Sequence, residues 1–193
     1  MKKLGLTLLA GLISTSAFAA PVGSTFTGFG VGLDLTTTKY KMDDENTKRA
    51  TGIGIVGDYG FDFGNNLVGL VEGKIKFNNS NIVNDHDGID DDVNTDEKWR
   101  ASLSYLQGYR VLPDLLPYVK VSYLVTKIEG DLREDNYFEH SEHTGSGVGI
   151  GLGVKYAVSS NFEVGAEYLR SRSKFYDEHV NANTFGANAT YRF

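Results

Sequence analysis

Apolar and polar side chains alternate along most of this chain. In the stretch GSGVGIGLGVKY, the apolar residues Val148, Ile150, Leu152 and Val154 occupy every second position, and glycines lie between them. Alternation with a period of two is typical of a β-strand whose two faces meet different surroundings. The same pattern recurs in eight stretches, at residues 26–35, 51–63, 67–77, 98–111, 117–126, 145–156, 162–171 and 184–193. The sequence therefore predicts an all-β protein with eight strands.

The two faces of these strands differ in a way that separates two fold classes. One face is almost wholly aliphatic and aromatic, and the other carries glycine together with charged residues. A soluble β-sandwich also alternates, but it packs its bulky residues inside and leaves its charges in water. A membrane barrel instead turns bulky apolar residues toward lipid and keeps a polar interior. The pattern favours the membrane barrel.

The connections between the stretches alternate between short and long. GNN, LPDLLP and VSSN join strands two to three, four to five and six to seven. The four other connections are long and polar: KMDDENTKRA, NNSNIVNDHDGIDDDVNTDE, KIEGDLREDNYFEHSEHT and SKFYDEHVNAN. This arrangement predicts an eight-stranded antiparallel up-and-down transmembrane β-barrel with three short periplasmic turns and four long external loops.

The N-terminus has the three parts of a secretory signal. Two lysines precede an apolar run from Leu4 to Ile13, and Ala17-Phe18-Ala19 follows as a small-x-small cleavage site. The alternative, an N-terminal core helix, does not explain all three parts, and the run is too short to span a bilayer. We expect residues 1–19 to be a signal peptide and residues 20–193 to form one outer-membrane β-barrel domain.

Aromatic residues cluster near the predicted strand ends, as they do at the two edges of a bilayer. We expect them to form membrane-interface girdles. The periplasmic girdle would contain Phe61, Phe63, Tyr109, Tyr156 and Phe162, with Tyr191 and Phe193, and the external one Phe77, Trp99 and Phe175. The chain also ends on an aromatic residue in the middle of an alternating stretch, which a closed barrel explains because the last strand then pairs with the first.

The terminal YRF, the stretch GSGVGIGLGVKYAVSSNFEVGAEY and the loop pattern together resemble the small OmpA/OmpX-like and opacity-family porin barrels of Gram-negative outer membranes. The resemblance covers about the full predicted mature chain. It implies location in the outer membrane, and it implies that Tyr191 and Phe193 form the C-terminal signal that the outer-membrane assembly machinery reads. It is specific for fold and location rather than for activity.

Six charged residues fall on the inward face of the predicted barrel. They are Asp58, Glu72, Lys74, Arg100, Lys120 and Glu167. Because a charge in a narrow interior must be paired and hydrogen-bonded, we expect an ion-pair network across the lumen. It either plugs the barrel or acts as a gate for small ions. A third interpretation, a route for a small apolar molecule, rests on the inward-phase residues Leu70, Leu106, Leu124 and Leu169, which apolar filling of the interior explains more simply.

The predicted loops contain residues that could carry chemistry. The acidic stretch DHDGIDDDVNTDE does not match the spacing of a calcium-binding EF-hand. Zinc binding is conceivable at His140 and His143, but solvated side chains are the default for these and for His86 and His179. Glu139, Ser141 and Glu142 beside the two histidines resemble a hydrolase set, yet a long loop gives no preorganised geometry. We expect no enzyme activity, no metal site and no cofactor.

The formal net charge of -6 argues against a nucleic-acid partner, which would need a basic surface. The expected partners are outer-membrane lipid and lipopolysaccharide, the assembly machinery and a possible host or surface ligand of the loops, with the protein a monomer. Two functions remain open. One is a surface-exposed scaffold whose loops make contacts such as adhesion, and the other is a narrow gated porin that passes small ions or solutes through the charged lumen.

Overall fold

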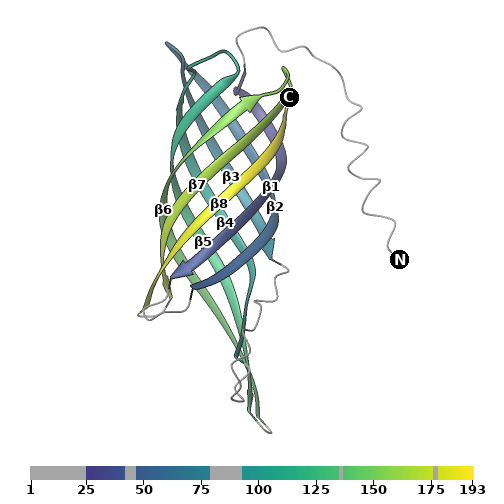
Figure 1. The fold of residues 1–193 in the computed structure, drawn as a ribbon, viewed down its shortest axis with the longest axis vertical. Coiled ribbons are helices and arrows are strands. Elements are labelled where there is room, and N and C mark those ends of the chain that lie inside the picture. The colour runs from purple at the N-terminus through teal and green to yellow at the C-terminus, as the bar shows by residue number, and fades with distance from the viewer. Residues whose placement is uncertain (1–24, 42–46, 79–92, 135–136, 176–177) are drawn as a thin grey trace, which may run out of the picture.

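The protein is a closed barrel of eight antiparallel strands, each paired with its sequence neighbours and β1 paired with β8 (Figure 1). The computed structural model describes residues 25–41, 47–78, 93–134, 137–175 and 178–193. The strands are β1 (Gly28–Lys41), β2 (Thr47–Gly64), β3 (Leu67–Asn78), β4 (Val93–Tyr109), β5 (Leu115–Glu134), β6 (Tyr137–Ala157), β7 (Phe162–Phe175) and β8 (Glu178–Arg192). The predicted fold class is confirmed.

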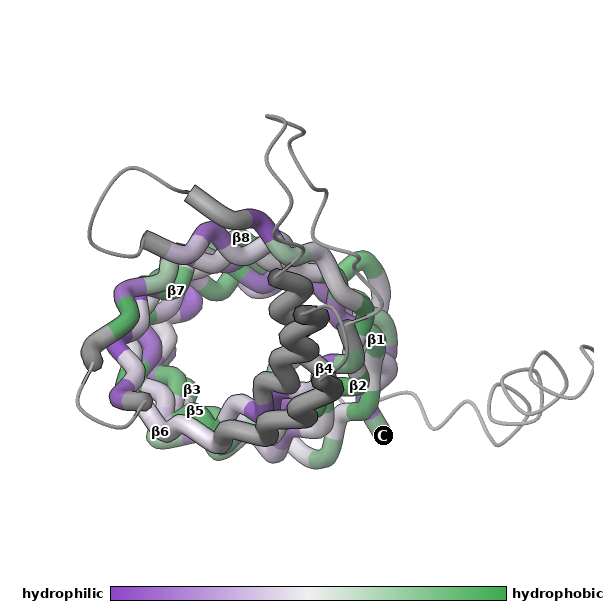
Figure 2. The backbone as a smooth tube through the Cα atoms, turned by 90° about the horizontal axis from the view of Figure 1, so that it is seen from below, coloured by the Kyte–Doolittle hydropathy of each residue, from purple (hydrophilic) through white to green (hydrophobic). Residues whose placement is uncertain are grey.

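The barrel has two unlike ends. The turns β2–β3, β4–β5 and β6–β7 lie at one end together with the last residue of the chain, and we call this the turn end (Figure 1, top). We call the opposite end the hairpin end. Viewed along the axis, the strands close into a single ring (Figure 2). At the turn after β2, Asn65 and Asn66 both have positive φ, 51° and 66°, as the tightest hairpin turns require.

The alternation places one set of side chains outside and the other inside. On β2, Ile53 and Ile55 are 62% and 54% exposed, whereas Val56 and Asp58 between the outward positions are buried. On β6, Val148, Ile150 and Leu152 are all more than half exposed. Among the described residues there is no helix long and apolar enough to cross a membrane. The outer wall is thus an apolar band, and the interior receives the polar set.

Two of the four connections expected to be long loops are instead mostly strand. β5 and β6 pair continuously from Leu115 opposite Tyr156 to Glu134 opposite Tyr137, and β7 and β8 pair up to Phe175 opposite Glu178. The prediction of loops was wrong here because a polar segment outside the membrane can still form a strand, in which its main-chain N–H and C=O groups hydrogen-bond to the neighbouring segment. Residues 93–97, 128–134 and 137–143 form a three-stranded sheet beyond the last pair of β3 with β4, and we call this sheet the extension.

The turn end is closed by the segment that precedes β1. Phe26 is fully buried in an apolar cluster with Val68, Leu70, Leu106, Leu116, Tyr118 and Ala157. Its φ of 69° is rare for a residue with a side chain, so the surroundings must hold it there. Arg110 donates to the carbonyl of Thr25 at 2.8 Å, and Thr25 Oγ1 donates to the carbonyl of Pro113 at 2.7 Å. The first stretch therefore enters the sheet only at Gly28, later than its alternation suggests.

The seam between the first and last strands is fixed at the turn end by the terminal residue. The Phe193 amide donates to the Phe29 carbonyl at 2.9 Å, and the two rings stack with centroids 6.0 Å apart. Tyr191 meets Phe193 edge to face at 5.1 Å. The apolar terminus thus has both a hydrogen-bond partner and an aromatic neighbour on β1.

A pair of glycine substitutions on β2 tests how the segment before β1 is held. A Cβ atom at Gly60 would lie 1.9 Å from the Phe26 carbonyl oxygen, whereas a Cβ at Gly57 meets its nearest atom at 3.9 Å. We expect Gly60→Ala to lower the free energy of unfolding by about 1–3 kcal/mol, the usual cost of overpacking, and Gly57→Ala to lower it far less. Denaturant unfolding in detergent micelles, followed by heat-modifiable gel migration, measures both, and equal effects would contradict the close approach.

Candidate functional site

The barrel interior contains eleven buried charged residues among those described, six cations and five anions. They are Asp34, Asp58, Glu72, Lys74, Lys76, Arg100, Lys120, Lys155, Glu163, Glu167 and Arg192. A single ion moved out of water without a partner costs several kcal/mol even after relaxation. The near balance of charge is therefore a condition for the barrel to fold around them.

The central cluster joins three carboxylates and two ammonium groups. Lys74 Nζ lies 2.8 Å from Asp34 Oδ1, 2.7 Å from Glu167 Oε1 and 3.7 Å from Glu72 Oε1. Lys120 Nζ lies 2.7 Å from Glu72 Oε1 and 3.0 Å from Glu167 Oε2. Tyr118 adds a hydroxyl hydrogen bond to Glu167 at 3.1 Å. Each lysine therefore bridges more than one acid.

The members of this cluster come from alternate strands. Asp34 lies on β1, Glu72 and Lys74 on β3, Lys120 on β5 and Glu167 on β7. None of these strands is paired with another of the set. Every bond between them, apart from the contact of Lys74 with Glu72, thus joins strands that no main-chain ladder connects. The bond of Lys74 to Glu167 joins β3 to β7, which lie on opposite sides of the ring.

A second cluster lies nearer the turn end and joins β2, β6, β7 and β8. Lys155 donates to Asp58 at 2.7 Å, and Arg192 contacts Glu163 at 2.5 Å and Asp58 at 2.8 Å. Arg192 also donates to the carbonyl of Gly28 at 2.8 Å. Because Arg192 lies on β8 and Gly28 on β1, this side chain holds the seam from inside, opposite the aromatic contact outside.

The interior toward the hairpin end is less tightly filled. Arg100 donates to Thr126 at 3.3 Å and to the hydroxyl of Tyr40, and its guanidinium lies 5.5 Å from the centre of the Tyr40 ring. A cavity of about 40 Å³ lies here, lined among others by Lys76, Leu124 and Leu169. One water needs roughly 10–15 Å³ of such space. The cavity therefore has room for a few waters and not for a continuous wide channel.

The single network expected from the sequence is divided. Glu72, Lys74, Lys120 and Glu167 come together, but Asp58 belongs to the second cluster, and Arg100 contacts Thr126 and Tyr40 instead of joining the central cluster. Four partners in these clusters were not predicted from the sequence: Asp34, Lys155, Glu163 and Arg192. All four occupy inward positions of the alternation, which was the available signal.

The four inward leucines have no common route. Leu70 and Leu106 lie in the apolar cluster at the turn end, whereas Leu124 and Leu169 line the cavity on the far side of the central ion pairs. Charged groups thus separate the two pairs. The interpretation of an apolar passage is wrong for this arrangement.

The outer wall carries the expected aromatic residues at both edges of its apolar band. Phe61, Phe63, Tyr109, Tyr156, Phe162 and Phe77 are 41–58% exposed, and Trp99 and Tyr191 are half-buried. Beyond the band, toward the hairpin end, the charged residues at described outward positions are all cations. They are Lys39, Arg49, Lys127, Arg170, Arg172 and Lys174.

The part of the chain whose side chains are described contains no candidate metal site. There, no group of three His, Cys, Asp or Glu residues could hold a metal ion. His86 lies outside the described residues, as do the side chains of His140, His143 and His179 and of Phe175. The side chains of Glu139, Ser141 and Glu142 lie outside them too, although their main chain is in β6. The absence of an enzyme function stays a prediction.

The chain belongs to the family of outer membrane protein beta-barrel domains, which matches residues 5–193. This membership makes it an outer-membrane protein and agrees with the apolar band on the outer wall. No curated protein matches the sequence.

Solved structures share the fold at low sequence identity. The chain is similar to Neisserial surface protein A, with 20% identity, a TM-score of 0.58 and coverage of 86% of this chain and 98% of the other. It is also similar to Ail, the attachment invasion locus protein of Yersinia pestis, with 18% identity, a TM-score of 0.57 and coverage of 86% and 99%. These likenesses agree with the closed eight-stranded barrel.

The central cluster predicts a large effect of removing one lysine. Lys74→Met leaves Asp34, Glu72 and Glu167 facing each other across the bore with one ammonium group fewer. We expect the free energy of unfolding to fall by about 3–5 kcal/mol, the range for breaking a buried ion pair from one side. The control is Ile75→Met, which places the same side chain on the neighbouring lipid-facing position. Urea unfolding in lipid vesicles compares them, and similar stability of the two variants would contradict the role of Lys74.

Proposed function

We propose that the protein is a surface scaffold of the outer membrane, whose barrel holds the extension outside the cell for contact with other surfaces. In this orientation the turn end faces the periplasm and the hairpin end faces outward. The proposal includes export by a cleaved signal peptide at residues 1–19 and a monomeric barrel, with Tyr191 and Phe193 recognised by the assembly machinery.

The observation that carries the proposal is the length of β5 and β6. A strand of about 9–11 residues spans a bilayer, and β3 with 12 residues is close to that length. β5 and β6 have 20 and 21 residues. Residues 128–134 of β5, which lie beyond the last pair of β3 with β4, correspond to about 23 Å of strand at about 3.3 Å per residue. A paired sheet that continues from a braced barrel presents its residues in a fixed arrangement.

The composition of the extension suggests what it contacts. Residues 128–143 include six acidic residues and one arginine. Like charges placed together cost free energy, whereas opposite charges steer association. The structure of Ail in complex with the heparin analogue sucrose octasulfate shows 15% identity and a TM-score of 0.55 to this chain. An acidic extension favours the opposite kind of partner, so we propose a basic protein surface as its ligand.

The closed interior supports a scaffold over a permanent pore. The apolar cluster with Phe26 fills the turn end, and the ion pairs cross the middle of the bore. An eight-stranded barrel encloses an interior just wide enough for side chains to fill. In this proposal the apolar cluster and the ion pairs stiffen the barrel wall that carries the extension.

Shortening the extension tests the proposal. In one variant residues 128–143 are replaced by Asn-Gly, which joins Lys127 to Thr144, a pair that faces across the two strands. The control keeps all sixteen residues but permutes their order with the two strands kept at equal length. We expect cells that display the shortened protein to lose attachment to an epithelial monolayer and to beads coated with a basic protein. Attachment that the permuted variant retains is due to the net charge of the extension, and attachment that it loses depends on the order of its residues. Unchanged attachment by the shortened variant would contradict the proposal.

One observation favours a gated porin as a second candidate. Glu167 accepts hydrogen bonds from Lys74, Lys120 and Tyr118, and both lysines lie within 4 Å of Glu72 Oε1, at 3.7 and 2.7 Å. The lysines can therefore exchange carboxylates without leaving the lumen. Such an exchange would open a path past the cluster while each charge stays paired.

Planar-bilayer conductance tests the second candidate. Glu72→Gln with Glu167→Gln leaves the two lysines facing each other with Asp34 as the one remaining carboxylate of the cluster. If the cluster is a gate, the variant opens more often than the wild-type protein and prefers anions, because the interior then has a clear excess of cations. If both proteins form heat-modifiable barrels and neither conducts, the cluster is a plug and the gated porin is excluded.

A further inference from the structure

We infer that the outer wall across β1–β4 binds one acyl chain of an anionic glycolipid from the outer leaflet, with Lys39 and Arg49 contacting its phosphate. The inference goes beyond the proposed function and shares with it only the orientation of the barrel. It rests on a groove, on two glycines and on a pair of cations.

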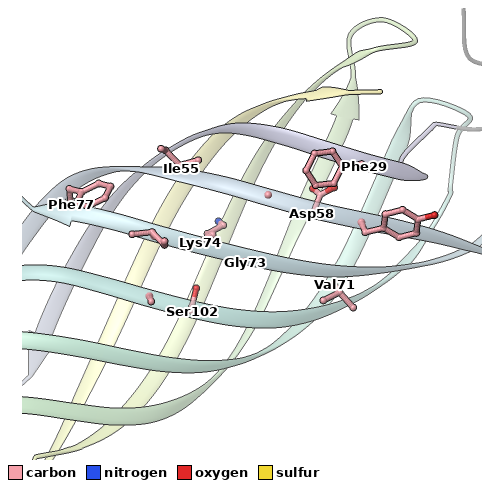
Figure 3. Close-up of a pocket in the computed structure, with 12 residues that line it drawn as sticks. Phe29, Ile55, Asp58, Val71, Gly73, Lys74, Phe77 and Ser102 are labelled. Atoms are coloured by element: carbon pink, nitrogen blue, oxygen red, sulfur yellow. The ribbon is translucent and has the colours of Figure 1, made fainter. Parts of the chain in front are cut away.

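The groove lies on the lipid-facing side of the barrel. It has a volume of about 580 Å³, within the range of pockets that bind small molecules. The outward side chains that line it are apolar or aromatic: Phe29, Ile55, Tyr59, Val71, Ile75, Phe77 and Ala101. Figure 3 shows Phe29 and Phe77 toward opposite ends and Gly73 between them. The hollow lies between bulky outward side chains such as Phe29 and Phe77.

The floor of the groove is bare main chain, because two outward glycines meet there. Gly57 on β2 pairs directly with Gly73 on β3. A Cβ atom at Gly57 would lie 3.9 Å from its nearest neighbour, the Gly30 carbonyl oxygen, and one at Gly73 would lie 4.0 Å from the Gly57 carbonyl oxygen. Packing therefore does not require glycine at either position.

A third outward glycine, Gly69, differs from these two because packing requires it. A Cβ at Gly69 would lie 2.6 Å from the Phe63 ring and 2.8 Å from the Tyr105 hydroxyl, so packing explains that glycine. A glycine inside a strand weakens it, and such glycines often mark the close approach of a ligand. The free space at Gly57 and Gly73 is consistent with a ligand that lies against the main chain.

The occupant is a lipid chain and not a second copy of this protein. The groove is continuous with the apolar band, where acyl chains surround the barrel. Asp58 and Lys74 also line it, but both are buried and paired inside the barrel, so no outward side chain of the lining is charged. In a twofold dimer each surface meets its own copy. Two hollows would then face each other and leave a void, whereas a flexible hydrocarbon chain can fill one hollow.

The position of two cations indicates which membrane leaflet supplies the lipid. Lys39 and Arg49 are directly opposite each other on β1 and β2, outward and toward the hairpin end. Phe77, at the end of the groove toward the hairpin end, pairs with Ile53, which is four residues or about 13 Å along the strand from Arg49. One leaflet contributes roughly 15 Å of hydrocarbon. A lipid with its phosphate at Lys39 and Arg49 therefore reaches the groove with its chain.

The periplasmic side of the same wall offers no such contact. At the described outward positions of β1–β4 toward the turn end, the side chains are apolar, aromatic or uncharged, as at Phe29, Phe61, Phe63 and Tyr109. An anionic headgroup in the inner leaflet finds no cation there. The charge distribution thus favours lipid A, a phosphorylated glycolipid, over a phospholipid of the inner leaflet.

Native mass spectrometry of the full-length mature protein tests the site. The protein is released from micelles that contain equal amounts of lipid A and phosphatidylethanolamine. We expect the wild-type protein to retain one lipid A molecule. Gly57→Leu with Gly73→Leu fills the groove and should reduce that retention by about tenfold, equivalent to about 1.4 kcal/mol. Lys39→Ala with Arg49→Ala should remove the preference for lipid A over phosphatidylethanolamine.

The matched control is Ala166→Leu with Ala187→Leu, which adds similar bulk at an outward pair of β7 and β8. It should retain lipid A as the wild-type protein does, and heat-modifiable migration shows that each variant has folded. Equal retention by the wild-type and groove-filled proteins would overturn the inference. A preference for phosphatidylethanolamine that ignores Lys39 and Arg49 would assign the groove to the inner leaflet and overturn it too, as would dimers that the groove-filling pair dissociates.

Discussion

The structure depends on one constraint: charges enclosed in a narrow barrel must find partners across the bore. An eight-stranded sheet leaves its interior just wide enough for side chains, so charged groups there lose most of their water. Lys74 and Lys120 answer this by bridging carboxylates on β1, β3 and β7 at 2.7–3.0 Å. Since adjacent strands are already joined by main-chain hydrogen bonds, the added bonds act where the sheet has none. The polar interior thus stabilises the cross-section that the ladder alone does not fix.

The interior is filled by different side chains toward its two ends, and this bears on function. Toward the turn end the β3–β5 wall supplies Val68, Leu70, Leu106 and Leu116 around Phe26, while the other wall supplies the paired charges of Asp58, Lys155, Glu163 and Arg192. Toward the hairpin end the described part of the interior contains a small cavity of about 40 Å³. A conducting state would have to move Phe26 as well as exchange carboxylates. The scaffold needs neither movement, and this is why the resting structure fits it better.

Much of this could be predicted from the sequence, because alternation determines which face each residue occupies. The strand number, the inward charges and the outward aromatic residues all follow from that single period. Alternation does not give the height of a side chain along the barrel axis or the strand that it faces across the interior. It therefore could not show that Asp58 pairs with Lys155 or that Asp34 belongs to the central cluster. Nor could it show that β5 and β6 continue through polar residues, since composition does not limit main-chain pairing in water. The positive φ of Phe26 has no local signal, because the surrounding groups hold it.

The outward positions of the same alternation face lipid instead of the polar interior. Outward residues that are not bulky and apolar can therefore indicate a function of the outer wall. At a lipid-facing position a bulky apolar side chain is favoured over glycine, because its apolar surface leaves water when the barrel inserts. Gly57 and Gly73 face lipid, and neither is required by a neighbouring atom. The cost of a glycine inside a strand is then offset by nothing within the barrel itself. The outer wall thus has a hollow at Gly57 and Gly73, and Lys39 and Arg49 lie on its hairpin-end side. This arrangement fits a molecule that has an apolar chain along the wall and a negatively charged group at its end. In an outer membrane the molecule with that form is the lipid of the outer leaflet.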